Sequence, residues 1–128
     1  MGRKTFEQVL TFGTWPYDGK PLTEMSRTLS EVPAHLGGKA TVSALEPRAL
    51  LAHLEANGHR RVYVDGGSVV QGFLREDRID ELVVTTVPVL LGSGIPLFGP
   101  LESDLEWTLT SSEQLFGGLV QSRYRRKR

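Results

Sequence analysis

Cysteine is absent from this chain of 128 residues, and histidine occurs only three times. Without cysteine there is no disulfide, no thiolate nucleophile and no thiolate metal ligand, which is typical of a cytoplasmic protein. The histidines His35, His53 and His59 lack metal-ligand spacing, and no serine stands in a G-x-S-x-G pattern. The sequence therefore predicts no metal site and gives no support to hydrolase chemistry.

Long uninterrupted apolar runs are also missing. Residues 82–101 carry no charge, but prolines and glycines at positions 88, 92, 94, 96, 99 and 100 break this stretch. A lipid-exposed helix does not tolerate so many interruptions, so we expect a strand followed by a loop and no membrane contact. Residues 1–10 are mixed in polarity and do not form a signal peptide. The length favours one domain over residues 1–128.

Net charge at pH 7 is zero, but the charges are unevenly distributed. Residues 123–128 hold five of the fifteen basic side chains, so residues 1–122 carry ten basic against fifteen acidic groups. A basic tail with one aromatic residue can contact nucleic acid, yet an acidic body repels it at long range. We interpret the tail as the end of a strand with frayed residues, and we do not expect nucleic acid as a partner.

The most informative local pattern is a strand, a diglycine turn and a helix. Residues 62–64 form a short β-rich apolar run that Asp65-Gly66-Gly67 ends. Ser68 is a suitable N-cap for the helix that follows, and the side chain of Asp65 is expected to cap backbone N–H groups. Such a turn exposes backbone N–H groups at a helix N-terminus and forms an anion site. The alternative is a tight connection without a ligand.

Strands and helices alternate along the rest of the chain. The predicted elements are a helix capped by Thr5 with Gln8, strands over 22–29 and 40–44, a helix from Pro47 to Ala56, a strand containing Thr85 and Thr86, and a hairpin of 105–116 with 119–125 across Gly117-Gly118. This order predicts an α/β fold with a largely parallel sheet covered on both faces.

Three segments resemble the dihydrofolate reductase superfamily, in particular its riboflavin-biosynthesis reductase branch. They are Gly2-Arg3-Lys4-Thr5, the stretch VYVDGGSVVQGFL with DELVVTTVPVLLGSGIPLF, and the ending WTLTSSEQLFGGLVQSRYRRK. The resemblance spans nearly the whole chain and implies a three-layer αβα fold with a mostly parallel sheet and a C-terminal antiparallel hairpin. Family members begin with a strand and loop that this chain lacks, so about the first quarter is expected to be missing. Met1 is either an internal methionine or the start of a truncated chain.

The resemblance implies NADPH as cofactor and assigns the residues that hold it. These are Gly2, Arg3, Thr5, Ser26, Arg27, Gly66, Gly67, Ser68 and Val69. Ser26 and Arg27 correspond to the contact with the adenosine 2′-phosphate, and a planar guanidinium suits that role. We expect no acidic residue there to bind a free ribose hydroxyl. The alternative for Arg3 and Arg27 is ordinary surface charge.

The remaining expectations concern reaction and partners. Thr85 and Thr86 are candidate substrate contacts, although β-branched residues equally well fill a strand. No catalytic side chain is indicated, since hydride chemistry belongs to the nicotinamide. The resemblance implies a reductase of a pteridine, pyrimidinone or related heterocycle, like 5-amino-6-(5-phosphoribosylamino)uracil reductase or dihydrofolate reductase. We expect a homodimer, because a fold without its first strand exposes apolar sheet surface and unpaired backbone groups that association can cover. We expect NADPH binding with little or no turnover, because the family's substrate loop would precede Met1. The alternative is a non-enzymatic remnant acting as an oligomeric nucleotide-binding or nucleic-acid-associated module.

Overall fold

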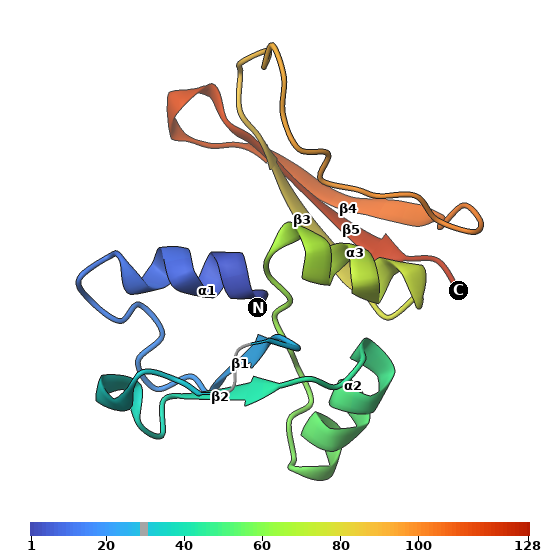
Figure 1. Ribbon diagram of the computed structural model, residues 1–128. Coiled ribbons are helices and arrows are strands. Elements are labelled where there is room, and N and C mark those ends of the chain that lie inside the picture. Colours follow the sequence, from blue (N-terminus) through green and yellow to red (C-terminus); the bar gives the residue numbers. More distant parts are fainter. Residues whose placement is uncertain (29–30) are drawn as a thin grey trace.

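The computed structural model describes residues 1–28 and 31–128, so Leu29 of the predicted first strand lies outside the described residues. Helices and strands alternate through the first half, and three strands dominate the second (Figure 1). In chain order the elements are α1 (Arg3–Leu10), β1 (Leu22–Met25), η1 (Ala34–Leu36), β2 (Ala40–Ser43), α2 (Pro47–Ala56), α3 (Gly67–Arg75), β3 (Glu81–Thr86), β4 (Trp107–Gln114), η2 (Phe116–Gly118) and β5 (Val120–Arg126). The predicted α/β class is confirmed.

The strands divide into two sheets. β1 and β2 are parallel, with Leu22 opposite Ala40 and Met25 opposite Ser43, so their carboxyl ends meet at one edge. β3, β5 and β4 form an antiparallel sheet in that order. Gly2 adds a parallel bridge to Met25, which brings the start of α1 beside the end of β1. Figure 1 shows α3 lying against the antiparallel sheet and α1 beside the parallel pair.

Residues 62–64 do not form the predicted strand. The segment runs between the two sheets without joining a ladder (Figure 1). Tyr63 is 83% exposed. An ion pair between Arg61 Nη2 and Glu81 Oε2, at 2.8 Å, ties the start of this segment to β3. Apolar β-branched residues favour a strand, but a strand also needs a neighbour with matching free backbone groups. The expected single, mostly parallel sheet is therefore split into a parallel and an antiparallel part.

Two predicted helix caps are wrong and one helix is confirmed. α1 begins at Arg3, so Thr5 lies inside its first turn, and α3 begins at Gly67, so Ser68 also lies inside. At α3 the residue before the helix is Gly66, whose φ of +95° is a conformation that glycine adopts readily. α2 runs from Pro47 to Ala56 as predicted, and Gly58 follows it with φ +84°.

Two apolar clusters form the core. In the first, α1 packs on the parallel sheet through Phe6, Leu22, Leu36 and Ala40. In the second, α2 and α3 pack together and onto the antiparallel sheet through Leu50, Phe73, Leu74 and Ile79. Helical spacing places Phe73 and Leu74 on the inward face of α3, as their positions in the sequence predict. The first cluster holds α1 and the second holds α3, so together they fix the two helix N-termini.

The C-terminal hairpin is confirmed, but the predicted frayed tail is wrong. β4 and β5 are joined through Phe116–Gly118, where Gly117 and Gly118 have φ of +77° and +76°. β5 continues to Arg126, whose Nε lies 2.7 Å from Asp77 Oδ1 and whose Nη2 lies 3.1 Å from Asp77 Oδ2. Lys127 and Arg128 form ion pairs with Glu106 and with Asp77 and Asp80. Local acidic groups therefore engage the tail cations. Within the described ranges, no helix is long and apolar enough to cross a membrane.

Candidate functional site

The N-terminal turns of α1 and α3 meet through glycines. A Cβ on Gly66 would lie 2.8 Å from Thr5 Oγ1 and 3.2 Å from the Gly2 nitrogen. A Cβ on Gly2 would lie 3.0 Å from Val69 Cγ2, so any side chain there forces its neighbour to move. The absence of side chains at both positions permits this approach. The structure thus brings together five of the predicted cofactor residues, namely Gly2, Thr5, Gly66, Ser68 and Val69.

The start of α3 offers free backbone donors. The Val70 N–H donates to the Gly66 carbonyl at 2.9 Å and is the first bond of this helix. The N–H groups of residues 67–69 therefore have no acceptor within the helix, and a Cβ at Gly67 would meet nothing within 4 Å. Asp65 Oδ1 accepts the Gly66 N–H at 2.7 Å, as predicted for this carboxylate. The geometry suits an anion at the beginning of α3.

A second polar group lies where β1 ends. Arg3 Nη1 donates to Thr28 Oγ1 at 2.9 Å, and Ser26 Oγ lies 3.4 Å from the same hydroxyl. The Thr28 N–H also donates to Ser26 Oγ at 3.2 Å, which closes a local turn. Arg3 therefore links the α1 terminus to the residues after β1. Sequence reasoning missed Thr28; the Ser-x-Thr spacing, typical of such hydroxyl turns, was the available signal.

The two predicted phosphate-binding arginines both contact carboxylates. Arg3 Nε donates to Glu7 Oε1 at 2.7 Å, and this hydrogen bond raises the pKa of Arg3, so its charge is secure. Arg27 Nη2 forms an ion pair with Glu46 Oε1. The prediction that no acidic residue is placed to bind a free ribose hydroxyl stays a prediction, but Glu46 lies beside Arg27, because the parallel pairing of β1 and β2 brings together residues nineteen positions apart. The site thus contains a cation and an anion at the same edge.

The two predicted substrate threonines lie at the end of β3, in the antiparallel sheet. Thr85 Oγ1 accepts a hydrogen bond from Gln121 Nε2 of β5 at 3.2 Å, and Thr86 lies opposite Val120. Successive strand residues point to opposite faces, so the two hydroxyls do not converge on one ligand. The contact of Thr85 matches the alternative in which these residues serve the sheet.

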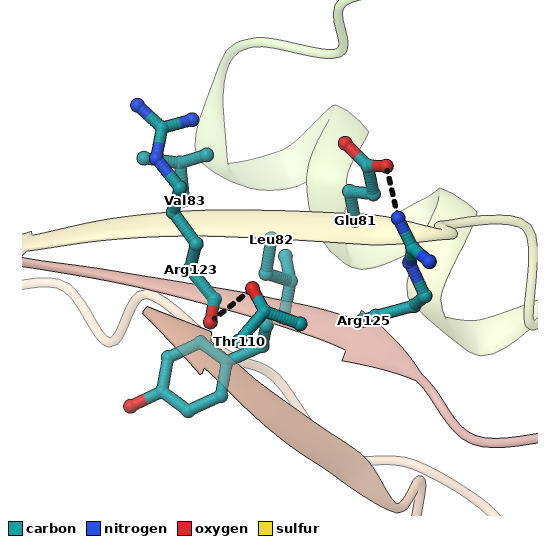
Figure 2. A pocket seen from close by; sticks show the side chains of 7 residues that line it. Glu81, Leu82, Val83, Thr110, Arg123 and Arg125 are labelled. Atoms are coloured by element: carbon teal, nitrogen blue, oxygen red, sulfur yellow. Dashed lines mark hydrogen bonds and ion pairs between the residues drawn. The ribbon is translucent and has the colours of Figure 1, made fainter. Parts of the chain in front are cut away.

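A shallow hollow lies on the antiparallel sheet, away from the predicted cofactor residues. Its lining residues are Glu81, Leu82, Val83, Thr110, Arg123, Tyr124 and Arg125 (Figure 2). Thr110 sits at the register shift of β4 and donates its hydroxyl to the Arg123 carbonyl at 3.1 Å. Arg125 lies 3.5 Å from Glu81, and Arg123 donates to Gln121. We assign no ligand to this hollow, which lies away from the junction of α1 and α3. No group of three or more potential metal ligands occurs in residues 1–28 and 31–128.

Comparison with known proteins gives a consistent result. Residues 16–121 match the RibD C-terminal domain family. The chain is 33% identical over 126 residues to the uncharacterized protein YwjB of Bacillus subtilis, covering 97% of this chain and 70% of YwjB. A crystal structure of a Shewanella sp. PV-4 protein assigned to riboflavin biosynthesis has a TM-score of 0.94 and 44% identity, covering 100% of this chain and 72% of that one.

A more distant structure shows the same fold. The diaminohydroxyphosphoribosylaminopyrimidine deaminase/5-amino-6-(5-phosphoribosylamino)uracil reductase of Thermotoga maritima has a TM-score of 0.71 at 17% identity, covering 98% of this chain and 44% of that one. The molecule thus has a dihydrofolate-reductase-like α/β fold. Within that class, the chain belongs to the RibD C-terminal domain family.

Proposed function

We propose that this chain is an NADPH-binding reductase domain that transfers hydride to a pteridine, a pyrimidinone or a related heterocycle. The observation that carries the proposal is the junction of α1 and α3. There Gly66 approaches Thr5 so closely that a Cβ would lie 2.8 Å from its hydroxyl, and Arg3 reaches from the same turn to Thr28. This junction places helix N-termini, hydroxyls and a cation next to one another, a combination that suits the phosphates of a dinucleotide.

The residues present fit such a cofactor. Open space at Gly67 leaves room for a pyrophosphate at the start of α3, with Thr5 and Ser68 as hydroxyl donors. Arg27 and Ser26, after β1, are candidates for the adenosine 2′-phosphate. When bound, the reduced nicotinamide supplies the hydride. The chain would hold and orient the cofactor, and a substrate contact by Thr85 and Thr86 stays a prediction.

Calorimetric titration with NADPH and NADH tests this proposal. We expect NADPH to bind, and Arg27→Ala to weaken NADPH by roughly tenfold while changing NADH much less, because only NADPH carries the 2′-phosphate. Arg125→Ala, in the other sheet, removes the same charge and serves as the control. Absence of NADPH binding at about millimolar concentration, or equal weakening of both cofactors, would contradict the assignment.

Turnover is a separate question from cofactor binding. Oxidation of NADPH in the presence of pteridines and pyrimidinones, followed by its absorbance, would identify the substrate class. Hydride transfer needs donor and acceptor held in alignment, so we expect turnover only with a heterocycle that this chain positions beside the nicotinamide. Full activity would show that the substrate site lies within the described residues.

We further propose a homodimer. The loop between β3 and β4 exposes large apolar side chains, with Leu90 at 99% and Ile95 at 94% exposure. Apolar surface of this kind is commonly covered by association. Light scattering at micromolar concentration should show a dimer, and Leu90→Ser with Ile95→Ser should shift it toward monomer. Phe12→Ser, at another exposed apolar position, is the control. A wild-type monomer would exclude the dimer.

A further inference from the structure

We propose that Glu46 determines how strongly the site prefers a 2′-phosphorylated cofactor. This inference rests on the proposed NADPH site. Glu46 competes with the 2′-phosphate for Arg27, and its carboxylate offers an acceptor to the 2′-hydroxyl of a cofactor without that phosphate. Both roles lower the preference for NADPH over NADH below what Arg27 alone would give.

Backbone geometry places the two side chains at the same edge. The Ser26 N–H donates to the Ser43 carbonyl at 3.0 Å, which extends the parallel pairing one residue beyond β1. The Leu45 N–H then donates to Ser43 Oγ at 3.3 Å as the chain turns toward α2. Arg27 and Glu46 both follow this paired edge, and their side chains form an ion pair. The contact therefore depends on the strand pairing, so it is not an accident of two long side chains alone.

The carboxylate of Glu46 has no structural task at the helix that it precedes. Glu46 is the N-cap of α2, yet its side chain makes no capping hydrogen bond. Glu76 Oε2 instead accepts the Arg48 N–H at 3.2 Å, at the first turn of α2. A substitution at Glu46 should therefore leave α2 intact. No capping hydrogen bond would have to break for this carboxylate to contact a ligand.

The ion pair is easily exchanged. The side chains of Arg27 and Glu46 are 76% and 63% exposed, and exposed pairs of this kind contribute little to stability. A phosphate, with more charge and three acceptor oxygens, can displace a carboxylate from the guanidinium. Glu46 would then remain beside the bound phosphate and repel it. In related α/β nucleotide sites an acidic residue accepts the ribose hydroxyl and an arginine accommodates the phosphate; here both are present.

Calorimetric titration of NADPH and NADH into four proteins tests the inference: wild type, Glu46→Gln, Arg27→Gln and the double variant. We expect Glu46→Gln to tighten NADPH by about threefold to tenfold and to leave NADH unchanged or weaker. When Arg27 is also replaced by Gln, the gain in NADPH affinity from Glu46→Gln should be smaller, since the phosphate no longer has to displace the Glu46 carboxylate from Arg27. Higher salt should also reduce the gain. Glu55→Gln, exposed on α2, is the matched control for net charge.

The outcomes separate this inference from the proposed function. If wild type binds NADPH but Glu46→Gln changes both affinities by the same factor, or neither, the role of Glu46 is overturned and the NADPH site stands. If Glu46→Gln weakens NADPH specifically, Glu46 helps to position Arg27 and the competition is overturned. If wild type binds neither cofactor, the proposed function fails and this inference fails with it. Thermal unfolding of each variant confirms that the comparison is made on folded protein.

Discussion

Each of the two core regions contains a charged side chain that is largely withdrawn from water. In the N-terminal region, built on α1 and β1–β2, Glu24 is 0% exposed. Neither of its carboxylate oxygens has a hydrogen-bond partner among the described residues. In the C-terminal region, built on α2, α3 and the antiparallel sheet, the Arg126 side chain is 10% exposed and makes two bonds to Asp77. A buried charge costs free energy unless it is paired, so the two regions should respond differently to substitution and to pH.

The pKa values of the two carboxyl groups shift in opposite directions. Burial raises the pKa of Glu24, although the positive Met1 amino group and Arg3 act against this effect. The hydrogen bond from Arg126 lowers the pKa of Asp77, and the charge of Arg126 adds to it. Raising the pH therefore penalises the first region, while lowering the pH penalises the second. The direction of each pKa shift therefore depends on whether the carboxylate accepts a hydrogen bond from a cation, as Asp77 does from Arg126, or is buried without one, as Glu24 is.

The largest expected effect comes from truncating one aromatic side chain in each region. Phe6 is 1% exposed and Phe73 is 2% exposed. Phe6→Ala and Phe73→Ala should each lower the free energy of unfolding by about 3–5 kcal/mol. If residues 1–128 form the single domain that the length predicts, thermal unfolding stays one cooperative transition in both variants. Two separate transitions, each moved by only one substitution, would show that the regions fold independently.

A smaller effect is expected at the paired charge. Arg126→Ala removes the bonds to Asp77, a 2.8 Å bond to the Glu106 carbonyl and the contact above the Trp107 ring. The free energy of unfolding should fall by roughly 1–3 kcal/mol at neutral pH, measured by urea denaturation. Arg125→Ala is the control, because its side chain is 70% exposed and its ion pair is long.

Measuring the stability of Arg126→Ala at low pH separates the ion pair with Asp77 from the packing of the Arg126 side chain. Because the folded pKa of Asp77 lies below its unfolded value, its contribution is present above the unfolded pKa and is lost as the pH falls through the folded one. The difference between wild type and Arg126→Ala should therefore shrink in acid. A difference independent of pH would mean that Arg126 acts through packing alone.

The smallest expected change is a gain in stability at the unpaired charge. Glu24→Met keeps the length of the side chain and removes an unsatisfied carboxylate, so stability at neutral pH should rise by about 1–2 kcal/mol. The folded pKa of Glu24 is raised, so its contribution is present below the unfolded pKa and lost as the pH rises through the folded one. The gain should thus be larger near pH 7.5 than near pH 4, by urea denaturation. Glu113→Met, exposed on β4, is the control; a loss of stability at both pH values would mean that Glu24 has a partner.

Local sequence signals predicted much of the fold but less of the site. Pro47 and Gly58 mark the limits of α2, and Gly117-Gly118 marks the hairpin, because these residues restrict or extend the backbone on their own. The prediction of a strand at residues 62–64 was wrong because a β-ladder also needs a neighbouring strand with free backbone groups. The predictions of N-caps at Thr5 and Ser68 were wrong, because the close approach of Gly2 and Gly66 determines where α1 and α3 begin.

By itself, the sequence determined the order of the helices and of every strand except the one predicted at residues 62–64, together with the glycine turns and the family resemblance. All of these depend on residues near one another in the chain. Tertiary structure alone decided which charges meet. Glu46 contacts Arg27 because two parallel strands end together, and Arg126 reaches Asp77 because β5 pairs beside β3. Glu24 of β1 is buried, and the charges that act on it are the Met1 amino group and Arg3 and Glu7 of α1. Charge pairing and desolvation depend on distances through space, which no local pattern records.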